Sequence, residues 1–92
     1  MSNWTITCSN SGMVHTCKNE RLARASFNLH CDHAARRSGE TVTLWRDSVR
    51  AAEFSGTSLA ARFLAHCLER STLADAEFWT RLAGVVRKAG TL

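Results

Sequence analysis

Apolar and polar positions alternate most clearly across residues 39–54, where two stretches with strand character flank a pair of turn-forming residues. The stretches are Thr41–Arg46 and Val49–Phe54, and Asp47-Ser48 lies between them. Short runs rich in β-branched and aromatic residues, separated by Asp, Ser or Gly, are typical of a β-hairpin. The pattern therefore predicts a hairpin with a two-residue turn.

A two-residue turn at Asp47-Ser48 places Trp45 opposite Arg50 across the two strands. Side chains of a strand point alternately to its two faces, so the strand divides into two sets. Val42 and Leu44 form one set, and Thr41, Thr43 and Trp45 form the other. Alternation alone does not decide which of these faces is buried.

A second hairpin is predicted at the amino-terminal end, from Trp4–Cys8 and Met13–Cys17 around the turn-forming segment 9–12. Pairing Cys8 with Met13 gives this hairpin one face suited to a core. That face carries Trp4, Ile6, Cys8, Met13, His15 and Cys17, and the other carries Thr5, Thr7, Val14 and Thr16.

A long helix is predicted between the hairpins, with Asn19 as its cap, an end near Arg37 and a stop at Gly39. At 100° per residue, its apolar positions form one broad arc expected to cover a face of the sheet. The arc contains Leu22, Ala23, Ser26, Phe27, Leu29, His30, Cys31, His33 and Ala34.

Two further helices are predicted, Leu59–Arg70 after the cap Ser58 and Leu73–Lys88 after Thr72. Asp75, three residues after Thr72, resembles the second half of a capping box. Each helix has an apolar side, and Trp79 is expected to anchor the last helix to the core. The sides contain Leu59, Ala60, Phe63, Leu64, Cys67 and Leu68 in one helix, and Phe78, Trp79, Leu82, Val85 and Val86 in the other.

The predicted order is ββ-α-ββ-αα, an α+β fold with a small antiparallel sheet of two hairpins, one packed helix and a carboxy-terminal helical hairpin. A chain of 92 residues makes one domain, 1–92. Within it, 1–56 form the ββαββ core and 57–92 form the αα-hairpin. The hairpin either packs on the sheet or serves as a lobe that faces a partner.

Composition limits the cellular compartments in which the chain is expected. It contains no proline, no apolar run of the ~18 residues that a membrane span needs, and no secretory signal at its start. We therefore expect a bacterial cytosolic protein without membrane contact. In that reducing compartment Cys8, Cys17, Cys31 and Cys67 are expected to be free thiols, mostly buried.

The net charge of +4 is carried almost wholly by arginine, since only Lys18 and Lys88 among the basic residues are lysines. Guanidinium groups form bidentate contacts with phosphates and carboxylates and stack on flat rings. If the end of the first helix lies close to the hairpin turn, a basic patch with one aromatic results. The predicted partner-binding residues are Arg21, Arg24, Arg36, Arg37, Arg46, Arg50 and Trp45. A contact in which Arg50 simply covers Trp45 is the structural alternative.

Histidines and cysteines raise two other hypotheses. Cys8, His15, Cys17 and His30 have the side-chain types of a tetrahedral zinc site, but no Cys-x-x-Cys pair accompanies them. The adjacent pairs His30-Cys31 and His66-Cys67 point about 100° apart on a helix, so neither forms a catalytic dyad alone. No glycine-rich phosphate loop or nucleophile elbow is present. The sequence therefore favours a protein that is not an enzyme and that needs no cofactor, metal or small-molecule substrate.

The pattern W-x-I…SG-x-x-H, followed by a helix and then SGETVTLWRD, resembles small proteins carried by bacteriophages and mobile elements over about the first sixty residues. Among these, anti-CRISPR inhibitors are similar in size, in single-domain α+β form and in lacking catalytic motifs. The resemblance implies an inhibitor that binds a host CRISPR-Cas effector complex and blocks target-DNA binding or nuclease recruitment. No residue matches a family motif, so no functional residues carry over.

One departure from that resemblance bears on the partner. Many such inhibitors are acidic DNA mimics, whereas this chain is basic, so a guide RNA or an acidic protein surface is the expected contact. Two other functions stay open: a small basic nucleic-acid-binding or regulatory protein, and a Cys/His metal-binding protein. The host complex, the stoichiometry and the oligomeric state do not follow from the sequence.

Overall fold

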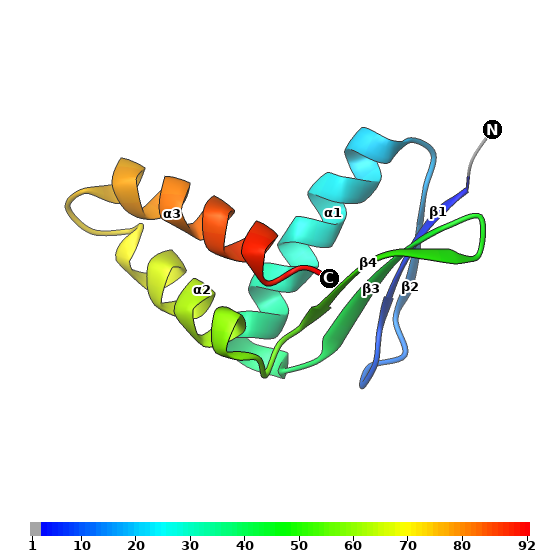
Figure 1. Cartoon of the computed structure of the whole chain (residues 1–92), viewed down its shortest axis with the longest axis horizontal. Helices are drawn as coiled ribbons and strands as arrows, with labels where there is room; N and C mark the ends of the chain where they lie inside the picture. Colours follow the sequence, from blue (N-terminus) through cyan, green and yellow to red (C-terminus); the bar gives the residue numbers. More distant parts are fainter. Residues whose placement is uncertain (1–2) are drawn as a thin grey trace.

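The computed structural model describes residues 3–92, which form one four-stranded antiparallel sheet and a set of helices (Figure 1). The α+β class predicted from the sequence is confirmed, as is the order of elements. In chain order these are β1 (Trp4–Cys8), β2 (Val14–Cys17), α1 (Glu20–His33), a π-helical turn η1 (Ala34–Ser38), β3 (Thr41–Arg46), β4 (Val49–Ser55), α2 (Leu59–Arg70) and α3 (Ala76–Ala89).

The two predicted hairpins join through their first strands, giving the strand order β2-β1-β3-β4. Both predicted registers are confirmed. The Cys8 amide donates to the Met13 carbonyl at 3.1 Å, and Trp45 pairs with Arg50. The register of β3 and β4 shifts between Leu44, which pairs with Ala52, and Trp45, which pairs with Arg50. This shift marks a bulge in β4.

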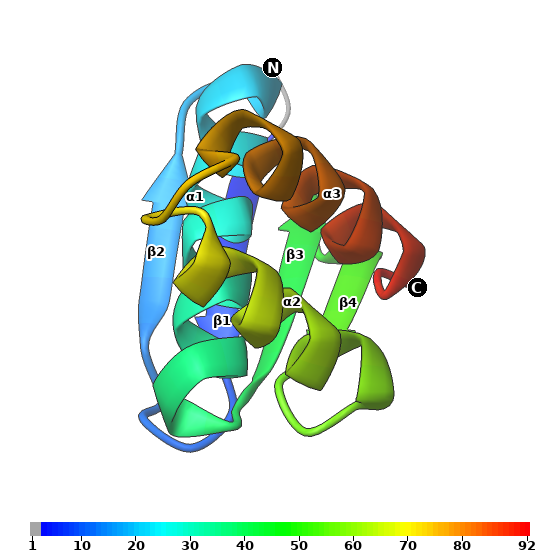
Figure 2. The same ribbon diagram turned by 90° about the vertical axis from the view of Figure 1, so that its left-hand side faces the viewer.

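The helices lie together on one side of the sheet, with α1 against the strands and α2 and α3 farther out (Figures 1 and 2). The face that the alternation of β3 left undecided is thereby settled: Val42 and Leu44 are fully buried beneath the helices. Thr5, Thr7 and Trp45 lie on the other, open face and are half-buried. We call residues 3–56 the sheet layer and residues 57–92 the α2–α3 lobe.

Two glycines shape the joint between the layer and the lobe. Gly39 ends the π-helical turn with a φ of 66°, a left-handed conformation that glycine adopts without steric cost. Gly56 donates to the Glu40 carbonyl at 2.8 Å. A Cβ at Gly56 would lie 2.8 Å from the backbone oxygens of Ala34 and Glu40, so the chain segments meet there with no room for a side chain.

The predicted helix caps are confirmed at two of three helices. Asn19 Oδ1 accepts from the Leu22 amide at 2.9 Å, and Ser58 Oγ accepts from the Ala61 amide at 3.1 Å. The predicted capping box of the last helix is wrong, because Thr72 Oγ1 donates back to the Glu69 carbonyl. Asp75 adopts a left-handed conformation immediately before α3, which therefore begins at Ala76 instead of Leu73.

The broad apolar arc predicted for the first helix is narrower in the structure. Ala23, Phe27 and Cys31 are buried against the sheet, whereas Leu22 and Leu29 point to solvent. A 14-residue helix on a small sheet contacts it along a stripe, so the margins of a wide apolar arc stay exposed.

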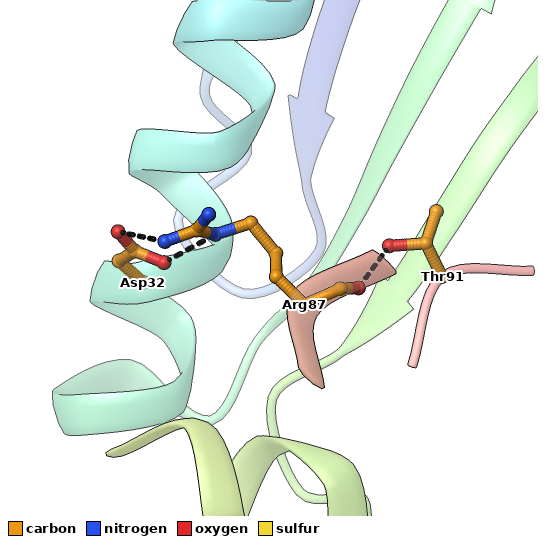
Figure 3. A network of polar contacts seen from close by, with 3 residues as sticks. All are labelled: Asp32, Arg87 and Thr91. Carbon is orange, nitrogen blue, oxygen red and sulfur yellow. Dashed lines mark hydrogen bonds and ion pairs between the residues drawn. The ribbon is translucent and has the colours of Figure 1, made fainter. Parts of the chain in front are cut away.

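A bidentate ion pair ties the α2–α3 lobe to α1. Arg87 Nε and one terminal nitrogen donate to the two carboxylate oxygens of Asp32 at 2.8 and 2.9 Å (Figure 3). Both side chains are only 18% exposed, so solvent screens the pair weakly. The backbone of Leu92 also exchanges two hydrogen bonds with Glu53, which attaches the end of the lobe to β4.

Candidate functional site

Three of the predicted arginines gather at the end of the sheet layer where α1 begins. Arg24 and Arg46 both lie over the ring of Trp4, with guanidinium carbons 5.7 and 5.5 Å from its centroid. Arg21 is exposed in the first turn of α1. Arg24 also forms an ion pair with Glu20 at 3.1 Å. These contacts make a basic corner, consisting of Arg21, Arg24 and Arg46 around the edge of a buried tryptophan.

Arg36 and Arg37 lie at the opposite end, in the π-helical turn, where they line a shallow hollow with Glu69 and Thr72 of the lobe. β3 runs for six residues from Thr41 to Arg46, a length of about 20 Å at the usual rise of a strand, and Arg46 lies at the end farther from this turn. The end of the first helix and the hairpin turn are therefore not neighbours. The single basic patch that depended on their proximity is two separate groups.

Trp45 and Arg50 face each other on the open side of the sheet, as their spacing predicted. The Trp45 indole donates to Thr7 Oγ1 at 2.9 Å, which holds the ring against the neighbouring strand. The Arg50 guanidinium reaches Glu53, at 3.4 Å, and is 59% exposed. Within residues 3–92, the guanidinium groups that lie over an aromatic ring are those of Arg24, Arg46 and Arg70, and Arg50 is not among them.

The candidate metal ligands differ in their burial, the cysteines being buried and the histidines more exposed. Cys8 and Cys17 lie in the core, whereas His15 and His30 approach each other at its margin with ring centroids 6.4 Å apart. Within residues 3–92, no group of three or more His, Cys, Asp or Glu side chains is arranged to hold a metal ion.

All four cysteines are free and buried, as expected from the sequence. Burial raises the pKa of the Cys31 thiol to about 12, and desolvation also raises the pKa of Cys8 and of Cys67. A thiol held protonated is a poor nucleophile, so the chemistry of these groups is that of small apolar side chains.

The structure also has an apolar groove between α2 and α3, with a volume of about 690 Å³. It is lined by Leu59, Ala60, Arg62, Phe63, His66, Val85, Val86 and Ala89, and we call it the α2–α3 groove. Leu59 is 82% exposed and Val85 is 64% exposed. Apolar side chains gathered in an exposed hollow are typical of an interaction site.

Aromatic rings continue the groove along the lobe. His66 stands between Phe63 and Trp79, with ring centroids 6.3 and 5.8 Å away, and Trp79 packs edge-on against Phe78 at 5.2 Å. Arg70 covers this cluster: its guanidinium lies 5.4 Å from the Trp79 ring centroid, and its Nε donates to His66 Nε2 at 2.8 Å. The contacts hold the rings in fixed positions, so the surface is preorganised.

The sequence assigned Phe63, Phe78 and Val85 to the apolar sides of their helices without separating core from surface. The structure buries Leu64, Cys67 and Ala83 instead and leaves these three side chains 47%, 58% and 64% exposed. A signal was present in the width of both apolar arcs, since a wide arc extends beyond the stripe of a helix that faces the core. Trp79 lies as expected, partly buried against the core.

Comparison of the chain with protein-family models, with curated proteins and with solved structures finds no match. None of the helices within residues 3–92 is long and apolar enough to cross a membrane.

Proposed function

We propose that this protein works by binding, as an inhibitor that occupies a surface of a host CRISPR-Cas effector complex and blocks target-DNA binding or nuclease recruitment. The observation that supports binding is the α2–α3 groove, where Phe63 and Val85 stay exposed although the chain is small. Exposed apolar side chains promote aggregation unless a partner covers them, so a continuous patch of them indicates an interface.

The class of partner rests on the resemblance of the first sixty residues to small phage and mobile-element proteins. The proposed inhibitor differs from acidic DNA mimics, because its net charge is +4. We therefore place the contact on a protein subunit of the effector complex, with the guide RNA within reach of the basic corner formed by Arg21, Arg24 and Arg46.

The test is a binding measurement against purified effector complexes assembled with their guide RNA. Each complex is titrated with the protein, and retention of labelled target DNA is measured along with direct association by size-exclusion chromatography. We expect one class of complex to bind the protein and to lose its target DNA. Association of no complex, in the presence or absence of guide RNA, contradicts the proposal.

A pair of substitutions connects this result to the groove. Val85→Asp places a charge in the groove, and Leu29→Asp places the same charge on the solvent side of α1, where the leucine is 70% exposed. Both sites are in helix interiors, so their effects on helix propensity are alike. We expect Val85→Asp to weaken association at least about tenfold and Leu29→Asp to change it less than about twofold.

A second candidate, a small basic nucleic-acid-binding protein, is favoured by the two guanidinium groups over Trp4. A protein of this kind binds DNA or RNA without a protein partner, with an affinity that falls steeply as salt rises. Reversing the charge of Arg21 and Arg24 then weakens nucleic-acid binding more than reversing Arg36 and Arg37 at the other end. A gel-shift series in rising salt separates this candidate from the inhibitor.

A further inference from the structure

The α2–α3 groove has the shape and dimensions of a binding site for a third helix. Its walls are two helices of 12 and 14 residues joined by a short connection, and they leave an open furrow along one side of the pair. From Leu59 to His66 the α2 wall is about 10 Å long, or two helical turns. Side chains of an added helix at positions i, i+3 or i+4, and i+7 match such a furrow.

The charges around the groove are basic. Arg62 is the one charged side chain among the residues that line it, and no acidic side chain lines it. Lys88 is exposed on α3 about 60° around that helix from Val85, beyond the groove, where it lines a separate hollow against α1 with Arg24 and Asn28. Neither Arg62 nor Lys88 forms one of the ion pairs found among residues 3–92.

The lobe carries three acidic side chains, Glu69, Asp75 and Glu77, and none of them is among the residues that line the groove. Glu77 pairs with Arg81 at 2.6 Å, and Glu69 lies beside Arg36 and Arg37 in the hollow on the other side of α2. Arg62 is thus the charged side chain on the α2 wall, and Lys88 lies beyond Val85 on the outer side of α3. Opposite charges on a binding partner complement this arrangement, and like charges oppose it.

From this combination of a furrow between helices, an apolar floor and a wall that carries a cation and no acidic side chain, we propose that the α2–α3 groove binds an acidic amphipathic helix of a partner protein. The inference rests on the proposed function, because it specifies the partner chemistry of the same surface. The partner helix places apolar side chains against Phe63 and Val85 and directs Asp or Glu toward Arg62. A second copy of this chain fits less well, since its own groove presents the same Arg62 cation.

The experiment uses fluorescein-labelled peptides of 18 residues and the full chain, without any effector complex. One peptide has leucines at helical spacing with glutamates on its flanks. A second has the same composition scrambled to break the spacing, and a third has lysines in place of the glutamates. Fluorescence anisotropy at constant ionic strength measures the affinity of each. We expect the acidic amphipathic peptide to bind at least about tenfold more tightly than either control.

Variants of the protein locate the binding. Val85→Asp is expected to weaken binding of the acidic peptide at least about tenfold, whereas Leu29→Asp leaves it within about twofold. Arg62→Glu is expected to weaken the acidic peptide and strengthen the lysine peptide, an inversion that loss of folding does not produce. Circular dichroism of each variant confirms that it is folded.

Three results overturn the proposal: equal affinity for the amphipathic and scrambled peptides, binding that is insensitive to Val85→Asp, or a dimer of the free protein that Val85→Asp dissociates while no peptide binds. The last result assigns the groove to a second copy. If the peptides fail but Val85→Asp still weakens association with an effector complex, this inference is wrong and the proposed function stands.

Discussion

The sheet layer and the α2–α3 lobe both carry patterns of apolar side chains and bury them to different extents. Ile6, Val42, Leu44 and Phe54 are all fully buried in the sheet layer. In the lobe most large apolar side chains stay exposed, and the buried positions are chiefly small residues around Leu64. One kind of apolar pattern therefore has two outcomes: in the layer it is buried and holds the chain folded, and in the lobe it leaves exposed side chains, which the proposed function assigns to a partner.

That difference predicts how substitutions act. Changes in the sheet layer or at its joint with the lobe lower the free energy of unfolding of the whole chain. Changes to the exposed side chains of the lobe alter binding and leave stability nearly unchanged. The following four predictions test the division, from the largest expected effect to the smallest.

The largest effect is expected at the joint. Gly56→Ala puts a methyl group 2.8 Å from backbone atoms at three sites, and backbone does not yield as a side-chain end does. We expect a loss of about 3 kcal/mol in the free energy of unfolding, measured by urea denaturation. Gly84→Ala is the control: it meets nothing within 4 Å in the middle of α3. There the alanine should stabilise by about 0.5–1 kcal/mol, and equal losses at both sites would contradict this account.

The ion pair between Asp32 and Arg87 contributes to the attachment of the lobe to α1. Asp32→Asn leaves the half-buried Arg87 guanidinium without its counter-charge, at an expected cost of about 2 kcal/mol. Amide hydrogen exchange should accelerate first in α3. Glu77→Gln breaks the exposed pair with Arg81, whose side chains are 79% and 78% exposed, and should cost less than about 0.5 kcal/mol. A similar cost for the two variants would show that the Asp32 pair does not hold the lobe.

The hydrogen bond of Trp45 on the open face of the sheet is expected to contribute to the free energy of unfolding. Trp45→Phe removes the indole N–H that donates to Thr7 at 2.9 Å and keeps an aromatic ring in place, so a loss of about 1 kcal/mol is expected. Thr7→Val removes the acceptor with little change in shape. Because the two substitutions break one bond, the double variant should cost less than the sum of the singles. Strict additivity would show that the bond contributes nothing.

Acid should weaken the sheet layer in two steps. Desolvation, with His15 and His33 nearby, lowers the pKa of His30 below 6.5, so the unfolded chain binds this proton more readily than the folded one. Stability therefore falls as the pH drops below about 6.5. The hydrogen bond from the Ser11 amide lowers the pKa of Glu40 below 4.5. Its contribution is present above that pH and is lost as the pH falls through the lower, folded value.

Two variants assign the steps. His30→Gln should remove the loss that begins near pH 6.5, and Glu40→Gln should remove the loss below pH 4.5, as measured by thermal unfolding from pH 7 to pH 3. A pH profile that neither variant changes would mean that other groups control the acid response.

Sequence reasoning succeeded where the signal is local. Alternation along Thr41–Arg46 predicted the strand and its pairing of Trp45 with Arg50, and capping chemistry predicted the helix starts at Asn19 and Ser58. It failed at Asp75, where a left-handed residue before α3 replaced the capping box expected from Thr72. A capping box, whose two partners are three positions apart, forms only if the chain enters the helix in extended conformation, and tertiary packing decides that.

The candidate site was harder to predict because it depends on which apolar side chains the neighbouring helices and strands cover. A helical wheel reports that Phe63 and Val85 lie on apolar arcs, but only the neighbouring elements determine that α1 leaves them uncovered. The separation of Arg36 from Arg46 likewise follows from the direction of β3, which the sequence does not state. The exposed groove is therefore a tertiary property, whereas the strands and helices beside it are largely local ones.

The crowding at Gly56 also offers a way to recognise distant relatives of this chain. Backbone from the end of α1 and from the start of β3 converges on that residue, so drift that erases surface and most core identities cannot place a side chain there. Gly39, Glu40 and Gly56 define a pattern that can be searched for in other sequences. It consists of a left-handed glycine, an acidic residue directly after it, and another glycine sixteen positions after the acidic residue. Relatives that have changed every groove residue to suit another partner should still retain it.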